Sequence, residues 1–552
     1  MQRRTFLAAG GAAAAMGAAG LEPVIALAQT AAMENPLLQP WTGPHGGIPP
    51  FGKFTVADFK PALETGMAET LAEYESIAND PAAPTFANVI EAQEKAGKRL
   101  NRSRSVYYTY AGTMNLPDFQ PVQTEMDPKI AAFGDKITQN EKLFARVDAV
   151  YNSPAKASLT PAQQRLVWTY WKNAARNGAK LNAADKKRVT EINQRLATLS
   201  AQFGQNLQAD EDGWVLYLKA ADMTGLPDSV KAGAAQAAEE KGRKGEFAIT
   251  NTRSSMDPFL TYSDRRDLRE KVWRTYYARG DNNDAHDNKA IITETLQLRA
   301  ERSKLLGYPT YAHWALADKM AKTPETAMDL MMRVWPSCVA RVHEEVAAMQ
   351  AVADQEKAGI KIAAWDYRYY AEKVRKAKYD LDMDEVKPYL QLDKIREAMF
   401  WASGQLYGFK YTKVNDVPVY HPDMVVYEVT GRDGQHVGLW YYDPYARTGK
   451  NSGAWMSEYR PQKRFDGVQA TIVSNNCNFV KAPPGQPVLI SWDDAITMFH
   501  EFGHALHGLN SNVDYASQAG TNVATDFVEF PSQLNENWLP TPEVLNRFCV
   551  HY

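Results

Sequence analysis

The sequence has few cysteines and almost no net charge, and each deficit excludes a class of protein. Its 552 residues include Cys338, Cys477 and Cys549, which are too few and too scattered for a disulfide framework or a cysteine-based zinc site. Lysine and arginine total 62 against 65 acidic residues, a net charge of -3. Without a basic surplus, no broad attraction to nucleic acid or to an anionic membrane is expected. Any metal must therefore be bound by histidine and carboxylate side chains.

The first 28 residues have the composition of an export signal. Arg3 and Arg4 precede a weakly hydrophobic stretch rich in alanine and glycine, and Ala26-Leu27-Ala28 forms a small-x-small cleavage site. The pattern resembles a twin-arginine signal, with a general secretory signal or an uncleaved anchor as alternatives. The many glycines argue against a stable membrane helix. We expect residues 1–28 to be removed and the mature chain to lie in the periplasm, free of the membrane.

Hydrophobic periodicity predicts a long helical body. Residues 34–54 are rich in proline and glycine and indicate an extended lead-in. From about residue 56 to 410 the pattern is mainly helical. Apolar residues recur at three-to-four spacing in 183–208, and likewise in 324–356, where Pro336 is expected to end or kink the helix.

A change of period after residue 410 predicts a small sheet. Residues 424–445 contain two runs rich in valine and aromatics around the turn 431–434, which is the pattern of a β-hairpin. Residues 470–475 and 487–492 are expected to add short strands. Within the helical body, the segment 226–248 is interpreted as loop.

The helix that follows carries HEFGHALH at residues 500–507, three of the chain's 10 histidines. Ser491, with an acidic residue three positions later, predicts where this helix begins. His500 and His504 lie four apart on one face, close enough to share a metal ion. Glu501 lies about 100° round the helix, beside such an ion, where a base for water belongs. The alternative is a chance HExxH pattern in a buried helix.

A site with two histidines needs a third ligand, and Glu529 is the natural choice downstream. It lies among apolar residues, where an unpaired carboxylate is costly to bury, and Pro531 indicates that a helix begins nearby. The alternative is that Asp526 and Glu529 form a capping box and bind backbone only. His507, one turn beyond His504, competes weakly as a ligand.

The combined string HEFGHALHGL and AGTNVATDFVEFPSQLNENW closely resembles the M3 family of zinc metallopeptidases, the thimet oligopeptidase family, and within it the bacterial peptidyl-dipeptidase branch. The resemblance extends over essentially everything after the signal, including MAKTPETAMDLM and SGAWM. It implies a mainly α, two-lobed, zincin-like fold with a small β-sheet beside the HExxH helix and a deep channel. Residues 29–410 would form the helical body, and 411–552 the catalytic region.

The resemblance also implies the roles of the site residues. His500, His504 and Glu529 match the zinc ligands, so one Zn²⁺ per chain is expected. Glu501 matches the catalytic glutamate. The expected chemistry is hydrolysis of a peptide bond by water activated at the metal, with Glu501 as the base.

Further residues are expected to support the ligands and to bind substrate. His507 and Asp526 are interpreted as partners that lie behind the ligands. The strand around Gly453, Ala454 and Trp455 is expected to pair with the substrate backbone by β-augmentation.

The implied function is the release of C-terminal dipeptides from short oligopeptides by a monomeric enzyme. An oligoendopeptidase of the same family, which cuts internally, is one alternative. The other is a non-catalytic protein that binds zinc or peptide. The non-catalytic alternative is kept because the family pattern continues into a region rich in histidine and tyrosine. This sequence stops at Tyr552 and is expected to be C-terminally incomplete.

Overall fold

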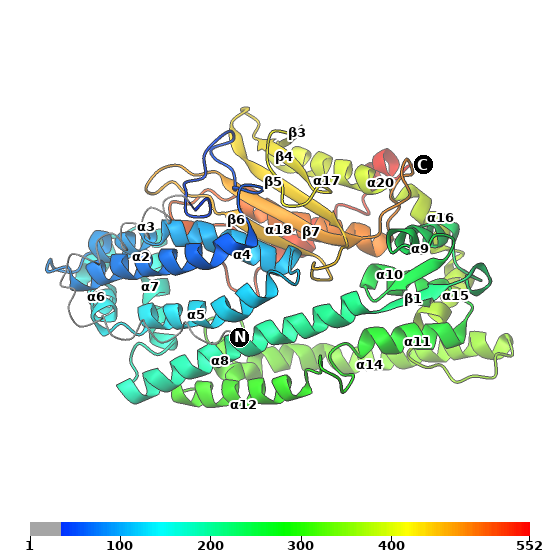
Figure 1. The fold of residues 1–552 in the computed structure, drawn as a ribbon, viewed down its shortest axis with the longest axis horizontal. Coiled ribbons are helices and arrows are strands. Elements are labelled where there is room, and N and C mark those ends of the chain that lie inside the picture. The colour runs from blue at the N-terminus through cyan, green and yellow to red at the C-terminus, as the bar shows by residue number, and fades with distance from the viewer. Residues whose placement is uncertain (1–34) are drawn as a thin grey trace, which may run out of the picture.

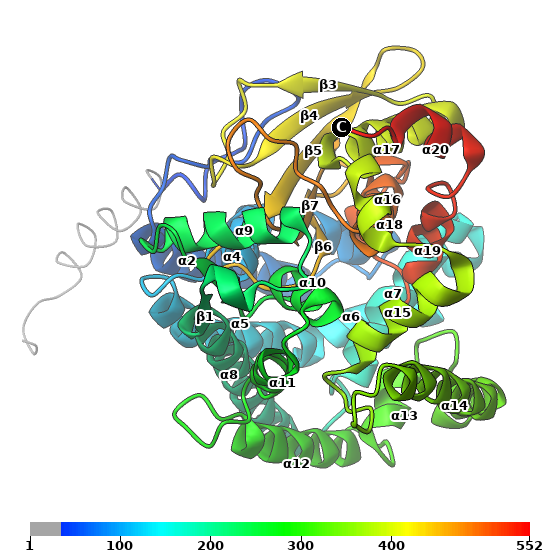
Figure 2. The ribbon, with the colours of Figure 1, turned by 90° about the vertical axis from the view of Figure 1, so that its right-hand side faces the viewer.

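The computed structural model describes residues 35–552, so the predicted export signal lies outside the described residues. The fold is mainly helical with one small mixed sheet, as predicted (Figure 1). Helices α2 to α7 (residues 59–176) lie to one side of the sheet. The long helix α8 (Ala183–Gly213) packs against α12 (Lys289–Leu305), and α12 and α14 (Pro324–Gln355) lie at the edge of the molecule farthest from the sheet (Figures 1 and 2). In the part of the chain that is described, no helix has the length and apolarity needed to cross a membrane.

Most of the helices precede the main sheet along the chain, and α18 to α20 follow it. In order they are α2 (Phe59–Asn79), α3 (Ala92–Lys95), α4 (Lys98–Thr113), α5 (Gln120–Thr138), α6 (Glu141–Asn152), α7 (Pro161–Arg176), α8 (Ala183–Gly213), α9 (Asp228–Glu240), α10 (Arg253–Tyr262), α11 (Arg266–Tyr277), α12 (Lys289–Leu305), α13 (Tyr311–Leu316), α14 (Pro324–Gln355), α15 (Tyr367–Tyr379), α16 (Met383–Val386), α17 (Leu392–Tyr407), α18 (Trp492–Leu509), α19 (Glu529–Glu536) and α20 (Pro542–Phe548).

The main sheet has five strands in the order β3-β4-β5-β7-β6. These are β3 (Lys410–Val414), β4 (Val425–Thr430), β5 (His436–Tyr445), β6 (Trp455–Arg460) and β7 (Thr471–Phe479). The predicted hairpin is confirmed as the antiparallel pair β4 and β5. This order places β3 and β6 at the two edges of the sheet. The β5–β7 pair is parallel, and the other neighbouring strands are antiparallel.

The sheet is buried on both faces, and successive side chains of a strand point to opposite faces. On β5, Trp440 and Tyr442 belong to the core that includes residues of α17 and α18. Leu439 and Tyr441 belong to a second core, formed with α2, α4, α5 and the lead-in. The lead-in is part of this core, where Phe51 is 1% exposed. The sheet therefore holds α18 on one face and the amino-terminal helices on the other.

Two predictions of local structure are wrong. The segment 226–248 is not loop, because its alanine-rich sequence forms α9 and then β2 (Phe247–Thr250), which pairs with β1 (Val215–Leu218). The segment 487–492 forms only an isolated bridge between Gln391 and Leu489. Proline at its start has no N–H to donate to a ladder. Of the two outcomes expected at Pro336, an end of the helix is excluded, because α14 continues through it to Gln355.

Candidate metal centre and active site

Helix α18 begins as predicted and is closely packed along its length. The Ser491 hydroxyl accepts from the Asp494 amide at 3.0 Å, and the Asp494 carboxylate accepts from the Ser491 amide at 3.1 Å. Gly503 lies against α19, because a Cβ there would stand 2.7 Å from the Cα of Ser532. Gly508 lies against β7 in the same way, 2.8 Å from a methyl group of Val473. These glycines let α18 lie close to both the sheet and α19.

Two buried asparagines hold the backbone of α18 on either side of His500. Asn475 of β7 donates to the carbonyl of Glu501 at 2.6 Å, and its own carbonyl accepts from the Trp440 indole at 2.6 Å. Asn535 of α19 donates to the carbonyl of Phe499 at 2.6 Å. Because the partners lie on a strand and on a second helix, they fix the rotation of α18 about its axis.

The three predicted ligand side chains meet in space. The Nε2 atoms of His500 and His504 lie 3.1 and 3.2 Å from one oxygen, Oε2, of Glu529. Ser532 donates to the same oxygen at 3.0 Å and so helps to orient it. Ligand atoms about 2.0–2.1 Å from a tetrahedral zinc ion are separated by about 3.3–3.4 Å. The donor set and its spacing therefore fit zinc.

Glu529 is positioned by the start of α19 and not by a capping box. The residue before α19, Val528, makes no side-chain cap, and Glu529 is the first residue of the helix. The Glu529 side chain remains 51% exposed, whereas that of His504 is 11% exposed. Burial lowers the pKa of His504 and so favours the neutral imidazole, the form that binds metals.

Glu501 faces the same site but does not contact the three donors. Its side chain is buried, and within the described chain its Oε2 atom has no hydrogen-bond partner. Burial raises the pKa of this carboxyl to about 7; the nearby His500 lowers it and Glu529 raises it further. A buried carboxyl that titrates near neutrality can both take and return a proton.

One residue of the site was missed in the sequence. The carboxylate oxygen Oε1 of Glu536 lies at hydrogen-bond distance, 2.7 Å, from Nδ1 of His500, the ring nitrogen that faces away from Glu529. A carboxylate behind a metal-binding histidine fixes its tautomer and ring orientation. The available signal was spacing, because Glu529 and Glu536 are seven residues apart and therefore lie on one face of a helix.

Two residues predicted to lie behind the ligands have other surroundings. Asp526 is exposed, and its two carboxylate oxygens accept from the amides of Met320 at 3.0 Å and Ala321 at 2.9 Å. It thus joins the segment before α19 to the start of the α14 region. His507 is half-buried on α18, and its Nδ1 has no hydrogen-bond partner among the described residues. Neither side chain contacts the three donors in the way that Glu536 and Ser532 do.

The predicted substrate segment lies at the edge of the sheet. Gly453 has a φ of 90°, and no described atom lies within 4 Å of where its Cβ would be. Its carbonyl accepts from Asn478 at 2.7 Å, and Trp455 begins the edge strand β6. Farther along, the carbonyl of Tyr459 accepts from Ser105 of α4 at 2.8 Å. The end of α4 also reaches the start of β6, since a Cβ on Gly112 would stand 3.5 Å from the Trp455 ring.

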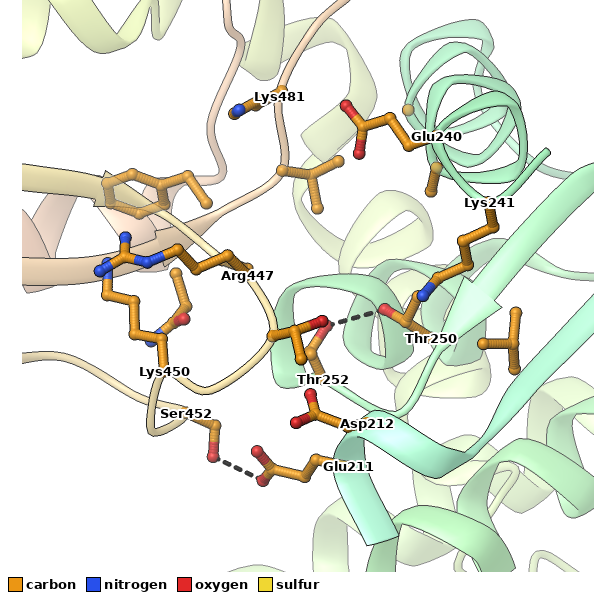
Figure 3. Close-up of a pocket in the computed structure, with 18 of the residues that line it drawn as sticks. Glu211, Asp212, Glu240, Lys241, Thr250, Thr252, Arg447, Lys450, Ser452 and Lys481 are labelled. Atoms are coloured by element: carbon orange, nitrogen blue, oxygen red, sulfur yellow. Dashed lines mark hydrogen bonds between the residues drawn. The ribbon is translucent and has the colours of Figure 1, made fainter. Parts of the chain in front are cut away.

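A pocket adjoins this segment, between α8, α9 and the loop after β5 (Figure 3). Ser452 lines it and donates to Glu211 at 2.7 Å. Two of its cations are already paired, since Arg447 and Lys450 lie 2.7 and 3.0 Å from a carboxylate oxygen of the buried Asp443. These two cations are thus committed within the protein and are not available for a substrate carboxylate.

Replacing Glu536 with glutamine is expected to weaken metal binding by about 10–100-fold, the usual effect of losing a partner behind a ligand. The amide keeps the shape but cannot accept a proton or carry the charge that orients His500. Dissociation constants from competition with a chelator measure the change. Glu543→Gln, on the exposed face of α20, is the matched control and should have no effect. Equal affinity in the two variants would show that Glu536 has no influence on the metal.

Comparisons with family models and with known proteins all point to one family of peptidases. The model of peptidase family M3 matches residues 259–552, and that of the neurolysin/thimet oligopeptidase N-terminal domain matches residues 62–187. The dipeptidyl carboxypeptidase of Escherichia coli is 38% identical over 94% of this chain and 76% of that protein. Oligopeptidase A of the same species is 30% identical over 94% of this chain and 77% of that protein. The chain is a member of peptidase family M3, a family of metal-dependent peptidases.

Proposed function

We propose that this peptidase is a zinc-dependent peptidyl-dipeptidase that releases dipeptides from the C-terminal end of short oligopeptides. The convergence of His500, His504 and Glu529 beside the buried Glu501 supports metal-dependent hydrolysis. The higher identity to the dipeptidyl carboxypeptidase, 38% against 30% for oligopeptidase A, supports the release of dipeptides. The relation to oligopeptidase A keeps internal cleavage as the second candidate.

The residues of the chain suggest how the reaction proceeds. A zinc ion held by His500, His504 and Glu529 would supply positive charge that lowers the pKa of water and polarises a carbonyl. Glu501 takes the proton from the attacking water, and it then gives that proton to the leaving amine. The buried position of Glu501 keeps bulk water from competing for the proton. Glu536 and Ser532 hold His500 and Glu529 in place during both steps.

The proposed enzyme works as a monomer on unfolded peptides. Glu501 and the three zinc donors come from one chain, on α18 and α19, so no second chain is needed to complete this set. β6 is an edge strand of the sheet, and an edge strand can pair with an extended peptide through main-chain hydrogen bonds. Sedimentation equilibrium across a range of concentrations measures the oligomeric state, and a dimer would contradict the proposal.

One pair of peptides tests the specificity. A peptide of six to eight residues with a free C-terminus should lose dipeptides successively from that end, as followed by mass spectrometry over time. The same peptide with an amidated C-terminus should be cleaved more slowly, because a peptidyl-dipeptidase recognises the terminal carboxylate. Equal rates with internal products would favour the oligoendopeptidase. Zinc binding without cleavage of either peptide would indicate that the chain is a non-catalytic binding protein.

We also propose that the protein is exported to the periplasm through the twin-arginine route. The adjacent Arg3 and Arg4 before an alanine-rich stretch support this. Changing both to lysine should leave the full-length precursor inside the cell, which immunoblots of cell fractions detect. The control changes Lys53 to arginine, beyond the signal, and should be exported normally. Unaltered export of the double-lysine variant would indicate the general secretory route instead.

A further inference from the structure

A second group of two histidines and a glutamate lies on the face of the sheet opposite α18. His45 comes from the lead-in, Glu428 from β4 and His436 from the first position of β5. The Nδ1 atoms of His45 and His436 lie 3.1 and 2.9 Å from one oxygen, Oε1, of Glu428. We propose that these three side chains bind a second divalent transition-metal ion, such as Zn²⁺, and that the ion fastens the lead-in to the sheet.

The arrangement has the same form as the candidate catalytic cluster. In both, two imidazole nitrogens converge on a single carboxylate oxygen at 2.9–3.2 Å. That spacing is close to the roughly 3.3 Å edge of a tetrahedral zinc site. Two imidazoles and a carboxylate suit zinc, copper, cobalt or nickel, and not the harder magnesium or calcium ions. The donor set therefore indicates a transition metal.

A β-bulge places His436 beside Glu428. Val429 pairs with Gly438 and Thr430 pairs with His436, so one residue of β5 has no partner in the ladder. That residue, Val437, packs against the core that contains α18, and His436 returns to the face on which Glu428 lies. In a regular strand His436 would point to the opposite face. A bulge commonly re-aims a side chain in this way.

The lead-in holds His45 in place before any ion binds. His45 has a φ of 56° and lies in a tight loop, where a Cβ on Gly47 would stand 2.1 Å from the carbonyl oxygen of Trp41. The Arg460 guanidinium of β6 donates to the carbonyls of Gly46 at 2.8 Å and Gly47 at 2.9 Å. A loop fixed in this manner brings a preformed ligand to the sheet, which reduces the entropy cost of binding an ion.

The surroundings of the two rings also suit metal binding. The Nε2 atom of His45 lies 3.8 Å from a carboxylate oxygen of Asp416, as expected for a carboxylate behind a metal-binding histidine. The side chains of His45, Glu428 and His436 are 13, 26 and 25% exposed, so the group is enclosed but reachable from solvent. The Nε2 atoms of both rings are buried and have no hydrogen-bond partner among the described residues.

Metal counting on the full chain tests the proposal. The chain is stripped with a chelator, loaded with Zn²⁺, dialysed and analysed by inductively coupled plasma mass spectrometry. We expect two zinc ions in the unchanged protein and one in His436→Gln or His45→Gln. The matched control is His286→Gln, because His286 lies near Asp210 and Asp284 in another group of possible ligands. It should retain two ions.

Thermal unfolding gives a second readout that does not depend on catalysis. In Glu529→Ala, added Zn²⁺ should still raise the melting temperature, since an ion that binds only the folded chain stabilises it. In Glu529→Ala with His436→Gln the rise should disappear. Equal zinc content in His436→Gln and the unchanged protein would overturn the proposal, as would loss of an ion in His286→Gln alone. Loss of one zinc ion in His436→Gln supports the second site even if Glu529 proves not to bind zinc.

Discussion

Glu501→Gln is expected to lower kcat/KM for peptide hydrolysis by about 10²–10⁴-fold, the usual contribution of a general base. The amide has the size of the carboxylate but cannot take a proton from water. Zinc content should not change, because Glu501 does not contact the donor atoms of His500, His504 or Glu529. Hydrolysis of a fluorogenic peptide and zinc analysis of the same samples measure both effects.

The control for this variant is Asp493→Asn on the same helix. Asp493 is exposed at the start of α18 and pairs with Arg253 at 2.6 Å, a surface contact worth at most about 1 kcal/mol. Its loss should leave hydrolysis within about twofold of normal, because Asp493 lies outside the site. Turnover by Glu501→Gln at the level of this control would refute the role of Glu501 as base.

Glu529→Ala is expected to remove one zinc ion per chain and nearly all hydrolysis. Two histidines alone bind zinc more weakly than three donors, so the loss should exceed the roughly 10–100-fold effect of Glu536→Gln. Stability of the metal-free fold should change little, because the side chain is half exposed. Circular dichroism and zinc analysis separate the two effects. Full zinc retention would show that Glu529 is not a ligand.

Some predicted features that depend on local sequence are found in the structure, whereas the loop at 226–248 and the strand at 487–492 are not. The helix start at Ser491 and the hairpin of β4 and β5 are examples of the features that are found. Capping and turn chemistry are properties of neighbouring residues and are therefore visible in a sequence. The meeting of Glu529 with the two histidines was predicted from apolar neighbours and family resemblance, and the packing of α19 on α18 at Gly503 brings it about.

Features that depend on distant contacts were not predictable. Asp526 was interpreted as a partner behind the ligands, but its oxygens bind amides at 320 and 321, about 200 positions earlier. The contact of Glu536 with His500 requires knowing that α19 runs beside α18. The strands β1 and β2 pair across α9, which spacing alone did not indicate. In each case the partner is chosen by tertiary packing and not by the local pattern.

The two hydrogen bonds that Asp526 accepts from the chain before α14 connect the affinity for zinc with the affinity for peptide. Asp526 lies three residues before Glu529, and its partners Met320 and Ala321 lie just before α14 begins at Pro324. A peptide whose binding displaces α14 would thus shift the donor oxygen of Glu529 and change the dissociation constant for zinc. Linkage requires the reverse effect to have the same size, so zinc would alter the affinity for that peptide by the same factor.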